Sequence, residues 1–207
     1  EYGVALGHWT EGMAIARRDG DRVSGCWCKL GMGQICDALD APDIAVKLFS
    51  DLERELENFT AARQRLPLVQ RARFDMRLRE LKAINTVNLG VNQMRSGKLD
   101  AALASLELGH SLAAAAEMQD IANECEVRIA EVHAHQGDCT RALAMLVSVQ
   151  TALEACAHHW ALATLFLLRA QCQSELGQLV EASASIGLAR MAADRANAKH
   201  IALRIER

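Results

Sequence analysis

The sequence predicts an all-α chain built from antiparallel helical hairpins that stack on one another. The composition of the chain and an internal repeat are the two observations that predict this fold. The 207 residues include only 2 prolines, aromatic residues make up 4%, and alanine and leucine recur throughout. A β-sandwich or β-barrel needs more β-branched and aromatic residues between turn-rich breaks, so this composition favours helices.

Three evenly spaced glycines, Gly97, Gly137 and Gly177, mark a repeat with a period of about 40 residues. Each glycine is suited to the left-handed conformation that ends a helix. The flanking positions share a pattern: a small residue seven before the glycine, an alanine five after it and an aliphatic residue nine after it. These are Gly90, Ala130 and Ala170; Ala102, Ala142 and Ala182; and Leu106, Leu146 and Ile186. The small residues let the two helices approach closely, and hairpins that cannot bury both faces alone must stack into a solenoid.

The N-terminal part fits the same pattern less regularly. Residues 1–21 are interpreted as the second helix of a truncated repeat, which ends at Gly20. Residues 22–65 form a degenerate repeat in which Asp40 takes the glycine position and Phe49 the position nine after it.

The segment between Asp40 and Gly97 contains an insertion, because these two residues lie further apart than one period of the repeat. We expect the extra residues in a longer helix pair near Pro67, which suits the first turn of a long helix. The repeats then cover 66–119, 120–159 and 160–199, and 200–207 begin a further helix. We therefore expect one helical-repeat domain over 1–207, as a fragment of a longer protein.

Leu89-Gly90, Gly97, Ala102 and Leu106 resemble the signature of the tetratricopeptide repeat. The other two repeats match it in part, and the family's usual period is about 34 residues. The chain is most similar to the extended variety found in bacterial signalling proteins and in transcription activators of the maltose-regulon type. This resemblance covers 84–200 closely and 1–60 loosely, and it implies a right-handed superhelix.

The resemblance also implies that a partner binds on the concave face, which the first helix of each hairpin lines. Asn88 stands where an asparagine often holds a ligand's backbone, and its amide offers both a donor and an acceptor. The same register along the chain predicts a groove formed by Asn85, Asn88, Asn92, Arg95, Arg128, Glu131, His135, Gln171 and Glu175. The asparagine is not repeated in the later hairpins, so asparagines that cap or bridge hairpins are an equal alternative.

A basic segment runs from Arg63 to Lys82, with a local net charge of +5 in a chain of net charge −3. Its centre is a basic patch of four arginines, Arg71, Arg73, Arg77 and Arg79. A solvated helix with ion pairs is one interpretation. The other is a docking surface for an acidic partner, such as another domain of the same protein. Nucleic acid is disfavoured, because the overall charge is acidic and no aromatic residues are usefully interleaved.

Motifs of catalysis are missing from the sequence. It has no phosphate-binding glycine loop, no nucleophile elbow and no paired spacing of a zinc site. Cys156 and His159 lie three positions apart and are the nearest approach to a metal-binding pair. We therefore expect no catalytic residue, no metal and no cofactor.

Cysteine usage and hydropathy bear on location. The seven cysteines have no framework spacing, which favours a reducing, cytoplasmic compartment. The longest apolar stretch, 161–168, is far shorter than the roughly 20 residues of a membrane-spanning helix, so we expect no membrane association.

Together these features predict a non-enzymatic module that binds a protein or peptide, or dimerises. The resemblance implies a sensor or regulatory role in a bacterial cytoplasmic signalling protein, attached to a cyclic-nucleotide-producing or DNA-binding output domain. The alternative is a small-molecule or peptide-pheromone receptor domain of a transcriptional regulator.

Overall fold

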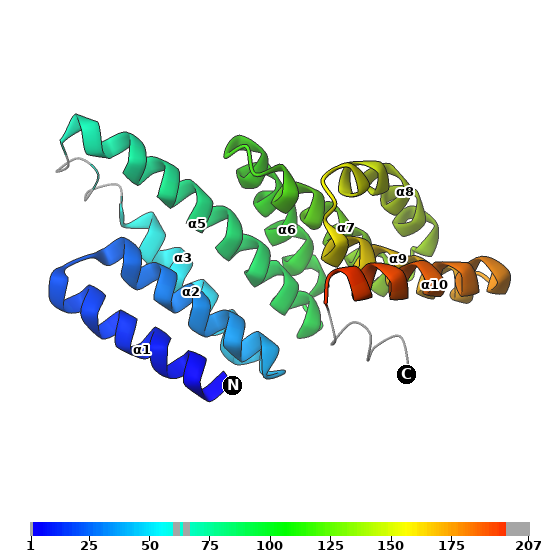
Figure 1. Cartoon of the computed structure of the whole chain (residues 1–207), viewed down its shortest axis with the longest axis horizontal. Helices are drawn as coiled ribbons and strands as arrows, with labels where there is room; N and C mark the ends of the chain where they lie inside the picture. The colour runs from blue at the N-terminus through cyan, green and yellow to red at the C-terminus, as the bar shows by residue number, and fades with distance from the viewer. Residues whose placement is uncertain (1, 60–62, 64–66, 198–207) are drawn as a thin grey trace. The chain divides into compact units, whose positions relative to one another are not determined.

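The computed structural model describes residues 2–59, 63 and 67–197, and all regular structure in this part of the chain is helical (Figure 1). None of the helices described is both long and apolar enough to cross a membrane. The helices are α1 (Tyr2–Asp19), α2 (Arg22–Ala38), α3 (Pro42–Glu57), α5 (Leu68–Arg95), α6 (Leu99–Ala115), α7 (Gln119–His135), α8 (Cys139–Ala155), α9 (His159–Glu175) and α10 (Leu179–Arg195).

The chain forms two compact units, Glu1–Met118 and Gln119–Arg207. In the first unit α1 packs on α2, α2 on α3, α3 on α5 and α5 on α6, and α2 also contacts α5. In the second unit α7 packs on α8, α8 on α9 and α9 on α10, and α7 also contacts α9. The prediction of an all-α chain in which consecutive helices pack together is confirmed within each unit.

Glycine ends the first helix of each predicted hairpin. Gly97, Gly137 and Gly177 have φ values of 75°, 86° and 76°, in the left-handed region that the sequence predicts for them. At Gly97 the turn is a Schellman motif, in which Lys98 N–H donates to the Gln93 carbonyl at 2.8 Å and Gly97 N–H donates to the Met94 carbonyl at 2.9 Å.

The second helices α6 and α8 end in the same way without a glycine, and so does the first helix α2. Glu117 and Ala157 have φ values of 59° and 53°, and Asp40, predicted at a glycine position, has a φ of 58°. Each helix from α6 to α10 has 17 residues, and short turns of equal length separate one from the next. From α7 onwards each repeat therefore consists of two helices of equal length, and only the turn after the first of them contains a glycine.

The predicted insertion near Pro67 lengthens one helix. The helix α5 has 28 residues, whereas α6 has 17. Pro67 immediately precedes α5, with φ −57° and ψ 146°. The further helix predicted over 200–207 lies outside the described residues.

Small residues bring the helices of a hairpin together, as the repeat pattern predicts. A Cβ built at Gly90 would come within 2.7 Å of Leu106 Cγ and within 3.2 Å of the Ala102 carbonyl oxygen. The residues seven before, five after and nine after Gly97 thus meet at one contact between α5 and α6. The same contact recurs between α2 and α3, where Gly33 lies against the ring of Phe49.

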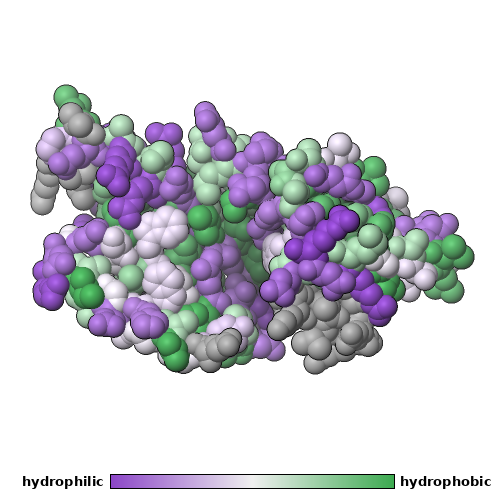
Figure 2. All heavy atoms as spheres, in the orientation of Figure 1, coloured by the Kyte–Doolittle hydropathy of each residue, from purple (hydrophilic) through white to green (hydrophobic). Residues whose placement is uncertain are grey.

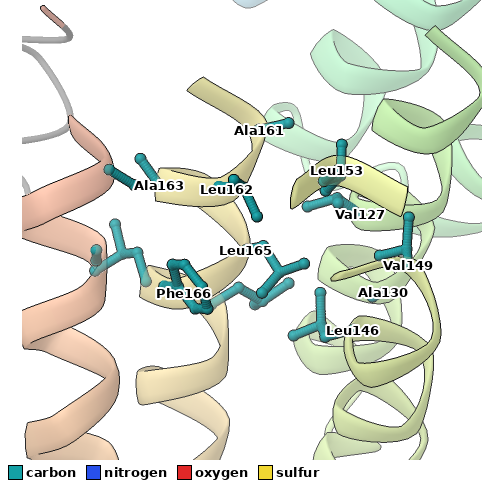
Figure 3. Close-up of a cluster of buried hydrophobic side chains, with 14 of the residues drawn as sticks. Val127, Ala130, Leu146, Val149, Leu153, Ala161, Leu162, Ala163, Leu165 and Phe166 are labelled. Carbon is teal, nitrogen blue, oxygen red and sulfur yellow. The ribbon is translucent and has the colours of Figure 1, made fainter. Parts of the chain in front are cut away.

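Each unit has its own apolar core. In the first unit the core gathers around Phe49, Leu52 and Leu81, all fully buried. In the second unit Leu165 points from α9 towards Leu146 and Val149 of α8 (Figure 3). These cores hold the first helices, on which the predicted groove residues lie.

Candidate functional site

Asn85, Asn88 and Asn92 form an asparagine stripe along α5, and this stripe lies largely inside the first unit. Asn85 is 1% exposed, and its Nδ2 donates to the Phe49 carbonyl of α3 at 3.0 Å. Asn92 is also 1% exposed, and its Nδ2 donates to the Asn88 carbonyl at 2.9 Å. Asn85 therefore bridges two helices, while Asn88, which is half-buried, is the member of the stripe nearest to solvent.

Three side-chain atoms of this stripe have no hydrogen-bond partner within the described part of the chain. They are Asn85 Oδ1, Asn88 Nδ2 and Asn92 Oδ1, all buried. A buried amide group without a partner costs about 1–3 kcal/mol. The face of α5 that carries the stripe is therefore incompletely satisfied by the fold itself.

Arg95 lies on the same helix and binds the end of α2. Its guanidinium forms ion pairs with the carboxylates of Asp37 and Asp40 and also donates to the Asp37 carbonyl at 3.2 Å. Because these groups remain partly exposed, Arg95 both ties α2 to α5 and presents a charge at the surface.

In the second unit the predicted groove residues Arg128 and Glu131 form a buried ion pair on α7. Arg128 Nη1 lies 2.8 Å from Glu131 Oε2, and the two residues are 8% and 7% exposed. The Arg128 guanidinium also lies 5.0 Å from the centre of the Trp160 ring on α9. This cation–π contact joins the two first helices of the unit.

His135, Gln171 and Glu175 lie at the surface of the second unit, on the last turn of α7 and the last two turns of α9. Glu175 accepts a hydrogen bond from the Cys139 thiol, with a sulfur–oxygen distance of 3.0 Å. These three are the groove residues that a partner can reach without rearrangement of the second unit.

The predicted groove residues thus divide into an inner and an outer set. Asn85, Asn92, Arg128 and Glu131 are buried, whereas Arg95, His135, Gln171 and Glu175 are exposed and Asn88 is intermediate. The first helices α5 and α9 each pack against both neighbouring helices of the chain and against a third helix, which leaves them only a narrow exposed strip.

The basic patch lies on the N-terminal half of α5. Arg73 and Arg79 are exposed, and Arg71 and Arg77 are half-buried. Asp75, between them, is bound by Arg63, with Nε–Oδ1 and Nη2–Oδ2 distances of 2.6 and 2.7 Å. These hydrogen bonds hold the pKa of Asp75 below its usual range, and the charges of Arg79 and Arg71 add to the effect. The patch therefore contains both an ion pair and exposed guanidinium groups.

The sequence pattern did not reveal a half-open pocket of about 360 Å³ in the first unit. The pocket lies where the α1–α2 turn meets the C-terminal end of α3, and three basic residues line it: Arg17, Arg22 and Lys29. The local signal in the sequence is the grouping of basic residues around Gly20. That grouping belongs to two different predicted repeats, so the repeat pattern did not join it into one site.

Most of the cysteines behave as buried apolar side chains. Burial raises the pKa of the Cys26 and Cys125 thiols to about 12, and the hydrogen bond to Glu175 raises the pKa of Cys139 to about 12. Cys156 is exposed and lies at the end of α8, where its thiol donates to the Leu153 carbonyl at 3.4 Å. The described residues contain no group of three or more His, Cys, Asp or Glu side chains that could hold a metal ion.

Comparison with known proteins adds no family assignment, because no protein-family model and no curated protein matches the sequence. The first helices and the surfaces described above are therefore the features that bear on function.

Proposed function

We propose that this chain is a non-enzymatic binding module: a right-handed superhelix of tetratricopeptide-like hairpins that binds a protein or peptide through its first helices. In this proposal it is the sensor or regulatory part of a cytoplasmic signalling protein. The observation that supports it most is the distribution of buried polar side chains.

Polar side chains are buried mainly on the first helices. Of the nine polar or charged residues that are buried in the described part of the chain, eight lie on α5, α7 and α9: Asn85, Thr86, Asn92, Asn123, Arg128, Glu131, His133 and Thr164; the ninth is Ser185 on α10. Burying a polar group costs free energy unless its hydrogen bonds are replaced. A fold that needed only stability would place apolar residues there, as it does on the second helices.

The unpartnered amide atoms indicate how a partner would gain affinity. Asn88 Nδ2 and Asn92 Oδ1 are a donor and an acceptor one turn apart on α5. An extended peptide backbone presents an acceptor and a donor with similar alternation. Asn88 is half-buried and is the member of this pair nearest to solvent, while Asn85 holds α3.

The exposed groups define what else the partner must contain. In the second unit the Glu175 carboxylate favours hydrogen-bond donors, and the Gln171 amide can both donate and accept. Because each hairpin contacts mainly its neighbours, a partner that contacts two first helices changes the angle between them. We propose this change of angle as the signal passed to an output domain.

A site-specific crosslinking experiment tests the proposal within the second unit. A photo-crosslinking amino acid is placed at His135 or Gln171, and in control proteins at Val147 of α8 or Ser183 of α10. All four positions are exposed, but only the first two lie on first helices. We expect one defined protein or peptide to crosslink from the first two positions and not from the controls.

The captured partner is then purified and its affinity is measured by calorimetry. We expect Gln171→Ala to weaken binding about two- to twelvefold, because an interfacial hydrogen bond contributes about 0.5–1.5 kcal/mol, and Ser183→Ala to leave it unchanged. Equal crosslinking from all four positions, or equal affinity of both variants, would reject binding by the first helices.

A further inference from the structure

The pocket of the first unit is lined by both basic and apolar residues. Its volume is about 360 Å³, within the range of small-molecule sites. The lining includes Met13 and Ala16 of α1, Arg17 and Arg22 beside the α1–α2 turn, and Phe59. Hydrophilic side chains gather over this turn (Figure 2).

The two acidic residues of the pocket have different partners. Asp21 caps α2, and its carboxylate accepts from the Ser24 amide at 3.1 Å and from the Ser24 hydroxyl at 2.6 Å. Glu55 forms an ion pair with Lys29 and accepts a long hydrogen bond from the Cys26 thiol. The charge of Glu55 is therefore balanced by Lys29, whereas Asp21 keeps its negative charge because its donors are neutral.

The two arginines of the turn carry the uncompensated charge. Within residues 2–59, 63 and 67–197, neither Arg17 nor Arg22 forms an ion pair with a carboxylate. The charge of Arg77 on α5 also acts on Asp21 and helps to hold its pKa below the usual range, after the larger effect of the Ser24 hydrogen bonds. Over the pocket lining, the three positive charges of Arg17, Arg22 and Lys29 exceed the two negative charges of Asp21 and Glu55 by one.

Arg22 is held in place before any ligand arrives. Its guanidinium lies 4.7 Å from the centre of the Phe59 ring, in a cation–π contact. A planar guanidinium that is fixed in this way keeps its N–H groups available at the edge of the plane for bidentate binding of a carboxylate or phosphate. The ring itself is 1% exposed, because Arg22 and Phe74 cover it, so Phe59 serves to position Arg22.

We propose that this pocket binds a small organic anion, with its carboxylate or phosphate group at Arg17 and Arg22 and its apolar or aromatic body against Met13. A metal cation does not fit, because both arginines are positively charged. This site is separate from partner binding by the first helices and does not depend on it.

Phenyl phosphate and benzoate are suitable probes, with benzyl alcohol as the neutral analogue and inorganic phosphate as the anion without a body. Binding to the whole chain is followed by ¹⁵N NMR of the arginine Nε–H signals and by calorimetry. We expect an aromatic anion to shift the Arg17 and Arg22 signals with millimolar affinity or better. We expect inorganic phosphate to bind more weakly and benzyl alcohol not to bind.

Three variants separate the site from general charge effects. We expect Arg22→Met to weaken binding about tenfold or more, because it removes both the charge and the planar set of N–H donors. We expect the affinity of Arg22→Lys, which retains the charge but loses the planar guanidinium group, to lie between the affinities of the unmodified chain and of Arg22→Met. Arg18→Met is the matched control: Arg18 lies on α1 next to Arg17, is exposed and pairs with Asp19.

Circular dichroism and the unfolding midpoint show whether each exposed substitution leaves the fold intact. Equal binding by Arg22→Met and Arg18→Met would overturn the proposal. So would equal binding of benzyl alcohol and phenyl phosphate, or the lack of a shift at Arg17 and Arg22 with every anion at tens of millimolar concentration.

Discussion

Gly90 of α5 and Leu106 of α6 lie in direct contact, so close that a Cβ at Gly90 would come within 2.7 Å of Leu106 Cγ. The Gly33–Phe49 contact between α2 and α3 is its counterpart, and these residues stand at the same positions of the repeat. One rule of the repeat, a small residue opposite a large one, thus acts in two hairpins of the first unit.

We expect Gly90→Ala to destabilise the chain by about 1–3 kcal/mol, because the added methyl group overpacks the contact with Leu106. Gly187→Ala is the matched control, since Gly187 lies within α10 and a Cβ there would meet nothing within 4 Å. The control should stabilise by up to about 1 kcal/mol through helix propensity. Urea unfolding measures both, and a neutral or stabilising Gly90→Ala would show that α5 and α6 are not in close contact.

The left-handed turns make a second prediction. Ala157 has a φ of 53°, which strains a residue with a Cβ, and Gly137 has a φ of 86° at the equivalent turn of the same unit. We expect Ala157→Gly to stabilise by roughly 0.5–1 kcal/mol and Gly137→Ala to destabilise by about 1 kcal/mol. Opposite shifts of the thermal unfolding midpoint are the test. Shifts of the same sign would contradict the left-handed geometry of one of the two turns.

A hydrogen bond between paired helices recurs two repeats further along the chain and can be tested by deletion. Ser105 Oγ donates to Gln93 Oε1 at 2.8 Å, and Ser185 Oγ donates to Gln173 Oε1 at 2.7 Å. Ser185 also accepts from Arg169 Nε at 3.0 Å. We therefore expect Ser185→Ala to lower the free energy of unfolding by about 2 kcal/mol and Ser105→Ala by about 1 kcal/mol, because Ser185→Ala leaves two groups without a partner. Equal losses of unfolding free energy in the two variants, measured in urea, would show that the hydrogen bond from Arg169 does not add to stability.

Buried thiols predict loss of stability at alkaline pH. The pKa of Cys125 is raised to about 12 by burial, from an ordinary value of 9.0. Between these values the unfolded chain loses the thiol proton and the folded chain keeps it, so the unfolded chain binds fewer protons and stability falls as pH rises. The fall is about 1 kcal/mol per pH unit above pH 9 for each such thiol.

The measurement is the free energy of unfolding at pH 8, 9, 10 and 10.5. Cys125→Ala should be less stable than the unmodified chain at pH 8, but its stability should fall less steeply above pH 9. Parallel curves for the two proteins would show that Cys125 ionises equally in both states.

Much of the helical framework follows from local chemistry. Gly97, Gly137 and Gly177 end helices because glycine adopts a left-handed conformation at low cost. The turns at Glu117 and Ala157, which lie halfway between successive glycines of the repeat, were not predicted. There the Schellman hydrogen bonds at the helix ends impose a positive φ on residues that do not favour it. The long helix after Pro67 was predicted because no proline interrupts it and Gly90 is its only glycine.

The sequence predicted which groove residues share a helix face, but it did not predict how deeply each of them is buried. Register along a helix states which residues share a face, and Asn85, Asn88 and Asn92 do share one face of α5. It does not state how deeply that face is covered, and α3 buries Asn85 by accepting its hydrogen bond at the Phe49 carbonyl. Burial depends on neighbours that are distant in sequence, so it could not be predicted from spacing.

Local sequence is enough to specify that the chain is helical, where most helices end and which small residues lie at helix contacts, because these properties depend on residues within one or two turns of each other. Packing between helices is what brings Arg128 over Trp160 and lines one pocket with Arg17, Arg22 and Phe59. Those contacts join different helices, and their geometry depends on the angles and distances at which the helices pack.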